Sequence, residues 1–258
     1  MLLSTHSSNL SLNINLYGIL MGIGFLVAFL IVYYLYKKKR RLNPEITFDL
    51  LLIVFPLSIL GARTYYVIFS GESFTFLEFW QIWNGGLAIY GGIIGGFLGL
   101  VIYAIIKKIN LFKITDAVAV GLIIAQAIGR VGCYFGGCCY GIEVTNPNLM
   151  WFPFSTLIDG VWHYSTFFYE AIWNLLGFVL LFIVYNKTER NGITTGTYLS
   201  FYGFGRFFIE ALRGDSLYIF SLKVSQILSA ILFFVGIIII VMSFVQSKGK
   251  NNEQKQNL

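Results

Sequence analysis

Charged residues are scarce in this sequence. Only 12% of its 258 residues are Asp, Glu, Lys or Arg, whereas 57% are hydrophobic, and the mean hydropathy is +0.75. A soluble domain of this length needs far more polar surface, so the composition excludes a soluble globular fold and predicts an integral membrane protein. Residues 1–15 lack the basic segment that precedes the apolar core of a signal peptide, so we expect a short mature tail there.

Long apolar runs take up most of the chain. A helix needs about 20 apolar residues to cross the hydrocarbon core of a bilayer. Seven segments meet this need, and we predict an all-α polytopic membrane protein with seven transmembrane helices in a single integral membrane domain, residues 1–258. The predicted spans are 16–36, 49–69, 86–106, 116–135, 167–185, 195–212 and 224–245.

Basic residues are nearly absent from every second loop between these spans. Thirteen of the 18 lie in segments that the span pattern puts on one side, namely 37–41, 107–113, 187–190 and 247–255. The loops of the other side hold only Arg213 and Lys223. The positive-inside rule therefore predicts an outer N-terminus and a cytoplasmic C-terminus. Topology alone explains the net charge of +6, and we expect no nucleic-acid partner.

Three basic residues, Arg63, Arg130 and Arg206, fall inside predicted spans, where a charge is costly and is usually functional or paired. At 1.5 Å per residue, each lies on the order of 10 Å below the outer end of its helix. Polar residues that come early in other spans lie at a similar depth, namely Tyr17, Tyr90, Tyr169 and Glu170. The pattern predicts one polar chamber that faces the outer leaflet.

The predicted span 195–212 carries a polar stripe. Tyr202, Arg206 and Glu210 are spaced four apart, so they share one helix face. One interpretation is a structural ion pair between Arg206 and Glu210. However, three intramembrane arginines face only two intramembrane glutamates, Glu170 and Glu210, and a surplus cation calls for an anionic partner. A phospholipid phosphate fits, because arginine offers it a bidentate fork.

Six stretches of the chain, taken in order, resemble the prolipoprotein diacylglyceryl transferase family. They are LYG (16–18), GARTYY (61–66), IWNGGLAIYGGIIGG (82–96), GRVGCYFGGCCYG (129–141), YEA (169–171) and YGFGRFFIEALRGD (202–215). The resemblance implies a cofactor-free enzyme of the bacterial plasma membrane whose active site faces the outer leaflet. Such an enzyme transfers diacylglycerol from phosphatidylglycerol to the lipobox cysteine in the signal peptide of an exported preprolipoprotein, forming a thioether.

The same resemblance implies roles for individual residues. Arg130 would bind the phosphate and Arg206 would assist the leaving group, with Tyr90 at the position of a family histidine. The predicted substrate-binding residues are Tyr17, Arg63, Tyr202, Glu210, Gly141 and Glu170.

The stretch 129–141 also departs from the family pattern. Cys133, Gly136 and Cys138 stand where the family has Asn, Asn and Glu. Together with Cys139, these cysteines can be small packing residues, a disulfide with one thiol left over, or a redox or nucleophilic group. We expect no metal, because no His or acid is spaced to complete a site. The alternatives are a paralogous transferase with another acceptor, a membrane thiol oxidoreductase, and an anion or lipid transporter.

Overall fold

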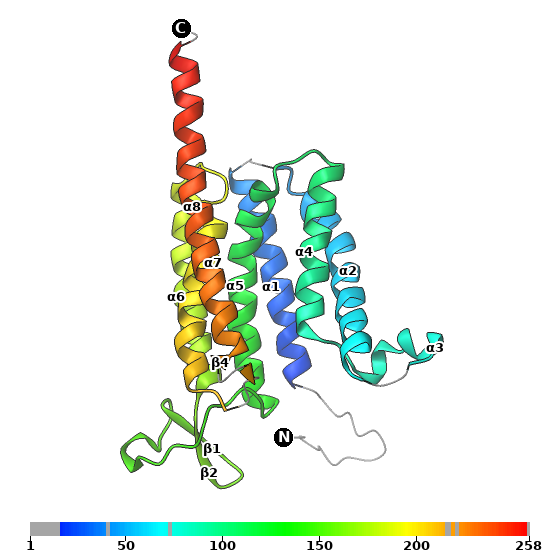
Figure 1. Cartoon of the computed structure of the whole chain (residues 1–258), viewed down its shortest axis with the longest axis vertical. Helices are drawn as coiled ribbons and strands as arrows, with labels where there is room; N and C mark the ends of the chain where they lie inside the picture. Colours follow the sequence, from blue (N-terminus) through cyan, green and yellow to red (C-terminus); the bar gives the residue numbers. More distant parts are fainter. Residues whose placement is uncertain (1–15, 40–41, 72–73, 215–217, 220–221, 257–258) are drawn as a thin grey trace. The chain divides into compact units, whose positions relative to one another are not determined.

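The structure is a computed structural model that describes most of the chain (Figure 1). The described residues are 16–39, 42–71, 74–214, 218–219 and 222–256. The tail expected at residues 1–15 lies outside them. The chain forms two compact units, one of Met1–Val32 with Asp116–Leu258 and the other of Tyr33–Thr115. The single domain over residues 1–258 stays a prediction.

The first unit is a bundle of long helices. Its members are the first part of α1 (Leu16–Lys39), most of α5 (Leu111–Phe135), α6 (Thr166–Lys187), α7 (Ile193–Ala211) and α8 (Val224–Gln256). Helices α7 and α8 touch closely because glycines line the contact: a Cβ on Gly203 would lie 2.6 Å from the carbonyl oxygen of Ser229. The chain reverses after each of α5, α6 and α7 (Figure 1). The end of α5, the start of α6 and the end of α7 therefore meet at one end of the bundle.

Buried Asp116 ties two helices of this bundle together. Its carboxylate, on α5, accepts hydrogen bonds from the backbone N–H groups of Gly192 (2.8 Å) and Thr195 (2.9 Å) and from the Thr195 hydroxyl (2.7 Å). These donors lie at the start of α7, where backbone N–H groups have no partner within the helix. Asp116 thus serves as a helix cap, as its type and position suggest, but for a neighbouring helix.

The second unit is built on α2 (Ile46–Phe69) and α4 (Ile89–Ile106), with the short helices α3 (Phe76–Phe79) and η1 (Ile82–Asn84) between them. Gly61 of α2 faces Gly91 and Gly95 of α4, and a Cβ on Gly91 would collide with the carbonyl group of Gly61. The glycine-rich stretch of α4 therefore allows close packing of two apolar helices, as small residues do in membranes.

Two short antiparallel hairpins interrupt the helical fold, and a purely helical prediction omits them. Strand β1 (Ser155–Ile158) pairs with β2 (Val161–Tyr164), and β3 (Tyr218–Ile219) pairs with β4 (Leu222–Lys223). The first hairpin turns at Asp159 and Gly160, which both have positive φ. Asp-Gly is the sequence that a two-residue hairpin turn favours, so this element had a local signal.

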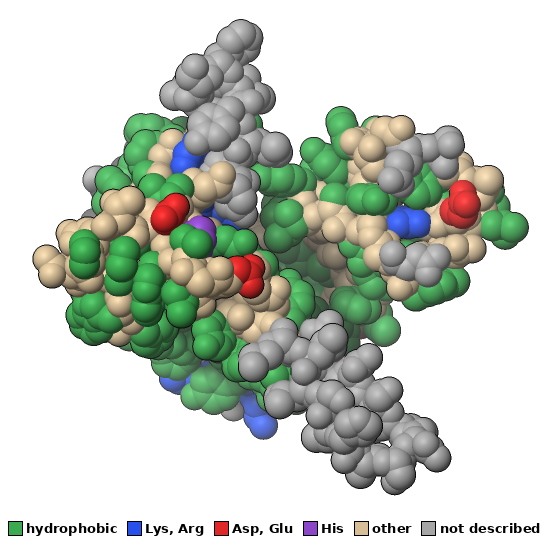
Figure 2. All heavy atoms as spheres, turned by 90° about the horizontal axis from the view of Figure 1, so that it is seen from below, with side chains coloured by type: hydrophobic (Ala, Val, Ile, Leu, Met, Phe, Trp, Pro, Cys, Tyr) green, Lys and Arg blue, Asp and Glu red, His purple; other side chains and the backbone are tan. Residues whose placement is uncertain are grey.

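Six helices of the described chain are long and apolar enough to cross a membrane, namely α1, α2, α4, α5, α6 and the part of α8 that ends at Val245. Many large apolar side chains are exposed along these helices, and they form broad patches on the face drawn in Figure 2. Helix α7 forms where the seventh span was expected, but polar residues such as Arg206 and Glu210 lower its hydropathy, and it is not among the six. The protein is a polytopic, mainly helical membrane protein; seven spans and their orientation remain predictions.

Candidate active site

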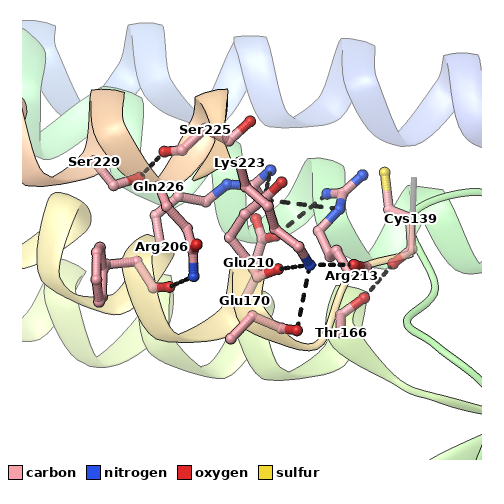
Figure 3. A network of polar contacts seen from close by, with 12 residues as sticks. Cys139, Thr166, Glu170, Arg206, Glu210, Arg213, Lys223, Ser225, Gln226 and Ser229 are labelled. Carbon is pink, nitrogen blue, oxygen red and sulfur yellow. Dashed lines mark hydrogen bonds and ion pairs between the residues drawn. The ribbon is translucent and has the colours of Figure 1, made fainter. Parts of the chain in front are cut away.

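An ion-pair cluster lies at the end of the first unit where α5, α6 and α7 meet (Figure 3). Glu170, in the first turns of α6, is only 3% exposed. Its carboxylate accepts a hydrogen bond from Nη1 of Arg206 on α7 and forms an ion pair with Nε of Arg130 on α5 at 2.6 Å, and Nη1 of Arg213 lies 3.6 Å away. One buried carboxylate therefore gathers guanidinium groups from three parts of the chain.

A second buried carboxylate, Glu210, completes this cluster. Glu210 is 1% exposed and forms an ion pair at 2.7 Å with Nη2 of Arg206, one turn earlier on α7. Nε of Arg213 lies 4.0 Å from the same carboxylate. Lys223 donates to the backbone carbonyls of Glu210 (2.8 Å) and Arg213 (2.6 Å), so an ammonium group satisfies the open carbonyls at the end of α7.

Two tyrosines border the cluster. Tyr202 lies on α7 one turn before Arg206. Its hydroxyl is close to the carboxylate of Glu170 and to the guanidinium of Arg130. Tyr17, at the start of α1, is close to Arg130 and the three cysteines. Its ring packs on the last turn of α5, 3.4 Å from where a Cβ on Gly132 would stand. The polar cluster is thus flanked by phenol groups from two helices.

The cysteines converge where α5 ends. Gly137 takes a left-handed conformation (φ 60°), and the backbone N–H of Cys138 donates to the carbonyl of Cys133 at 3.0 Å. This bond across six residues is a helix-terminating motif that glycine favours, and it folds the loop back over the helix. The three Sγ atoms, all free thiols, come within 4.8 Å of one another.

Cys139 faces the arginines. Its backbone also has positive φ (62°), and its carbonyl accepts from the Thr166 hydroxyl at 2.7 Å. Nη1 of Arg130 donates to its sulfur at 3.3 Å. A hydrogen bond from the Cys133 thiol and the positive charges of Arg130 and Arg213 lower the pKa of Cys139 to about 5, against the effect of burial. The loop therefore presents a thiolate to the guanidinium groups near neutral pH.

Gly141 packs the cysteine loop onto the rest of the site. Its N–H donates to the carbonyl of Tyr164 at 2.8 Å, and a Cβ there would lie 2.6 Å from the carbonyl oxygen of Leu212 and 2.8 Å from Cβ of Tyr164. Gly141 forms an isolated bridge with Arg213. Glycine at this position lets two backbones approach and brings Arg213 to the carboxylates.

Arg63 and Tyr90 belong to the second unit. Arg63 is 4% exposed, and its guanidinium donates to four backbone carbonyls, those of Glu78 (2.6 Å), Phe79 (2.9 Å), Gly85 (2.9 Å) and Gly86 (3.1 Å). Tyr90 lies in the first turn of α4, partly exposed and 6.3 Å from the ring of Tyr65. Here the arginine holds a loop in place rather than facing a carboxylate.

Comparison with known proteins identifies the family. The family model described as prolipoprotein diacylglyceryl transferase matches residues 6–242. The chain belongs to this family. A relative from Clostridium perfringens, named phosphatidylglycerol–prolipoprotein diacylglyceryl transferase 1, is 40% identical over 95% of both chains. A relative from Streptococcus pneumoniae with the same activity in its name is 42% identical over 89% of this chain and 90% of its own length. Another, from Listeria welshimeri, is 40% identical over 90% of this chain and 86% of its own length.

The structure brings most of the predicted site residues of this diacylglyceryl transferase family member into one cluster. These are Tyr17, Arg130, Cys133, Cys138, Cys139, Gly141, Glu170, Tyr202, Arg206 and Glu210. Of the three intramembrane arginines, Arg130 and Arg206 contact the two glutamates, whereas Arg63 donates to backbone carbonyls. The catalytic and binding roles of all these residues stay predictions.

Arg213 and Lys223 join the cluster without having been predicted. Both were interpreted as ordinary loop residues before the last span. The spacing of Arg213, three residues after Glu210 and just beyond the end of α7, was a signal that could have found it. Lys223 is distant in sequence from its carbonyl acceptors, and only the β3–β4 hairpin brings it there.

Proposed function

We propose that this protein transfers a diacylglyceryl group from phosphatidylglycerol to the cysteine thiol of a prolipoprotein. Family membership over most of the chain supports this, as do relatives that are about 40% identical over nearly their whole length and carry this activity in their names. The observation that carries the proposal in the structure is the convergence of Arg130, Arg206 and Arg213 on the buried carboxylates of Glu170 and Glu210.

The proposed transfer reaction requires positive groups near the departing phosphate, and this cluster supplies them. The attacking thiolate sulfur forms a bond to a glyceryl carbon, the bond from that carbon to the phosphate oxygen breaks, and glycerol-1-phosphate leaves with the electron pair. Negative charge grows on the departing phosphate, and fixed guanidinium groups in a site shielded from water stabilise it. The phosphate of the donor would compete with Glu170 for Arg130 and Arg206, and Arg213, 3.6 Å from Glu170, would remain to compensate the displaced carboxylate.

An apolar groove next to this cluster fits the donor's acyl chains. It has a volume of about 560 Å³ and runs between α7 and α8 from Phe207 and Ile227 to Ile238. Phe207 follows Arg206 directly in the sequence. A lipid whose phosphate contacts Arg206 can therefore place hydrocarbon along this groove, which is apolar like the bilayer around it.

The location of the reaction follows from topology. We propose seven spans, α7 included, with the N-terminus outside and the cluster facing the outer leaflet of the bacterial plasma membrane. The support is the concentration of Lys and Arg in alternate loops. Polar α7 can span because its charged face turns to Glu170 and Arg130, inside the bundle.

A second function, transfer to a different acceptor, is favoured by one observation. Three positions of the stretch 129–141 depart from the family pattern, and the two cysteines among them, Cys133 and Cys138, lie next to Cys139, which contacts Arg130. A paralogous transferase would keep the lipid-binding arginines and change the residues that meet the acceptor.

Complementation tests the main proposal and separates it from the paralogue. The gene is expressed in bacteria depleted of their own diacylglyceryl transferase, and growth and lipoprotein modification are followed. Purified protein is then supplied with phosphatidylglycerol and a lipobox peptide, and the thioether product is measured by mass spectrometry. Rescue and product support the proposal. Well-expressed protein that does neither, yet releases glycerol phosphate with cell extract, would show another acceptor; no release would contradict both functions.

A further inference from the structure

Three thiols meet at one point, and the transfer reaction proposed above uses none of them. Cys133 is buried in the last turn of α5, and Cys138 and Cys139 are half-buried in the loop that folds back over it. The three Sγ atoms lie within 4.8 Å of one another. The convergence cannot be predicted from the sequence spacing of the cysteines, because it depends on the positive φ angles of Gly137 and Cys139.

The spacing of the sulfurs suits one shared metal ion. Zinc–thiolate bonds are about 2.3 Å long, so three thiolates on one ion of this size lie about 3.8–4.0 Å apart. The sulfurs of this loop reach that arrangement with movements of less than about 1 Å, which small side-chain rotations supply. The fixed backbone contacts, from Cys138 to Cys133 and from Thr166 to Cys139, can stay in place.

The donor set selects the kind of ion. Thiolates are soft donors that favour Cu(I) and Zn(II) over hard cations such as Mg²⁺. Among the described residues, the three sulfurs are the whole set of converging ligand atoms. A structural zinc site almost always has four protein ligands. Three soft donors without a fourth favour Cu(I), which accepts trigonal coordination.

The surroundings compensate the charge of such a complex. Cu(I) with three thiolates carries two negative charges, and the guanidinium groups of Arg130 and Arg213 both act on Cys139. Nη1 of Arg130 already donates to this sulfur at 3.3 Å. An N–H donor on a metal-bound sulfur holds the ligand in orientation and stabilises its charge.

We propose that Cys133, Cys138 and Cys139 form a three-thiolate binding site for one Cu(I) ion at the end of α5. On binding, each thiol that is still protonated releases its proton to solvent and forms one Cu–S bond, and no electron is transferred. The ion lies beside the arginine cluster and fixes the conformation of the loop that carries Cys139, whose sulfur contacts Arg130.

Anaerobic titration of the full-length protein in detergent tests the site. Cu(I) is added from a buffered complex with a chromophoric chelator, and the copper transferred to the protein is read from the chelator's absorbance. The expected result is one equivalent bound by the reduced protein and at least a tenfold weaker affinity in each of Cys133→Ser, Cys138→Ser and Cys139→Ser. Tyr134→Phe, a change in the same turn that keeps every thiol, should bind like the unchanged protein.

A measurement on the unchanged protein covers the case in which a serine variant misfolds. Cu(I) should protect all three cysteines from alkylation, as read by intact mass, and removing the ion with excess chelator should restore all three reactions. Substoichiometric binding, equal binding by the triple serine variant, or alkylation at an unchanged rate in the presence of Cu(I) would overturn the proposal. None of these readouts depends on lipid transfer, so their failure leaves the transferase proposal intact.

Discussion

Two buried arginine environments, one in each unit, differ in what neutralises the charge. Arg63 in the second unit donates to four backbone carbonyls of the segment 78–86. Arg130 and Arg206 in the first unit instead share the carboxylate of Glu170. Sequence places the three residues in the same class, as arginines inside apolar spans.

The difference decides which arginine can meet a substrate. Backbone carbonyls are fixed dipoles within the fold, and leaving them without a donor costs free energy. A side-chain carboxylate is not part of the backbone, and a phosphate of the same charge sign can take its place on the guanidinium fork. We therefore interpret Arg63 as a structural clamp, and Arg130 and Arg206 as groups that exchange anions. The predictions below test this contrast.

The largest effect is expected for the shared arginines. Arg130→Ala and Arg206→Ala should each lower kcat of diacylglyceryl transfer by about 10²–10³-fold, because each removes a positive group from the departing phosphate. The measurement is product formation from phosphatidylglycerol and a lipobox peptide in vesicles. Arg190→Ala, which removes a guanidinium stacked 4.5 Å from the Phe244 ring, is the control and should keep near-normal activity. Near-normal turnover in Arg130→Ala or Arg206→Ala would contradict the exchange of anions.

Arg63 should act on stability instead. Arg63→Ala leaves four carbonyls of the loop without their donor, and we expect the free energy of unfolding to fall by about 2 kcal/mol, roughly thirtyfold in the equilibrium. Arg63→Lys should recover only part of this loss, because an ammonium group lacks the planar fork that reaches both Glu78 and Gly85. Unfolding in mixed micelles measures both variants. An Arg63→Ala protein of full stability but without transfer would move Arg63 into the class of substrate-binding residues.

The sequence predicts helices well and their polar contacts poorly. Apolar periodicity is local, so each long helix forms at its expected place, and α7 begins at Ile193 rather than 195. Ends set by polar residues are less well predicted: α5 begins at Leu111 rather than 116, and α8 continues to Gln256 rather than ending at 245. The partner of a buried arginine is not local. Nothing near residue 63 in the sequence indicates that the carbonyls of 78–86 fold under it, and Lys223 reaches α7 only through a hairpin.

The cysteine loop shows the same limit at the candidate site. The sequence shows three thiols, an arginine and several glycines within a dozen residues. It does not show which glycine takes positive φ, and that choice decides whether the sulfurs diverge or converge. Glu170 and Glu210 could be paired with arginines by counting charges, whereas the contact between Arg130 and Cys139 depends on the fold of the loop.

Charge compensation by titratable groups should make the first unit sensitive to pH. The pKa of Cys139 is lowered to about 5, so its thiolate stabilises the fold above the ordinary thiol pKa of about 8.5, and this contribution is lost as pH falls through about 5. At pH 6, Cys139 of the metal-free protein should react with iodoacetamide on the order of tenfold faster than an ordinary thiol, since its larger thiolate fraction outweighs its weaker nucleophilicity.

Cys138 is the internal control for this experiment, because burial and the neighbouring Cys139 raise its pKa. Peptide mapping after brief alkylation should find label at Cys139 well before Cys138. Equal labelling of the two cysteines at pH 6 would mean that Arg130 and Arg213 do not hold a thiolate there.

The smallest effect contrasts one aspartate in each unit. Asp116 in the first unit is fully buried and accepts three hydrogen bonds at the start of α7, two of them from backbone N–H groups. Asp49 in the second unit accepts from the Tyr103 hydroxyl at 2.8 Å, and its side chain, 44% exposed, lies 3.7 Å from Lys107.

Asp116→Asn should cost about 1 kcal/mol of unfolding free energy, as the loss of a helix cap does. Asp49→Asn should stay within about 0.5 kcal/mol, because exposed ion pairs contribute little. Equal losses would show that burial of a carboxylate does not decide how much it contributes to the free energy of unfolding. Burial of Glu170 and Glu210 would then be no reason to expect that they stabilise the fold.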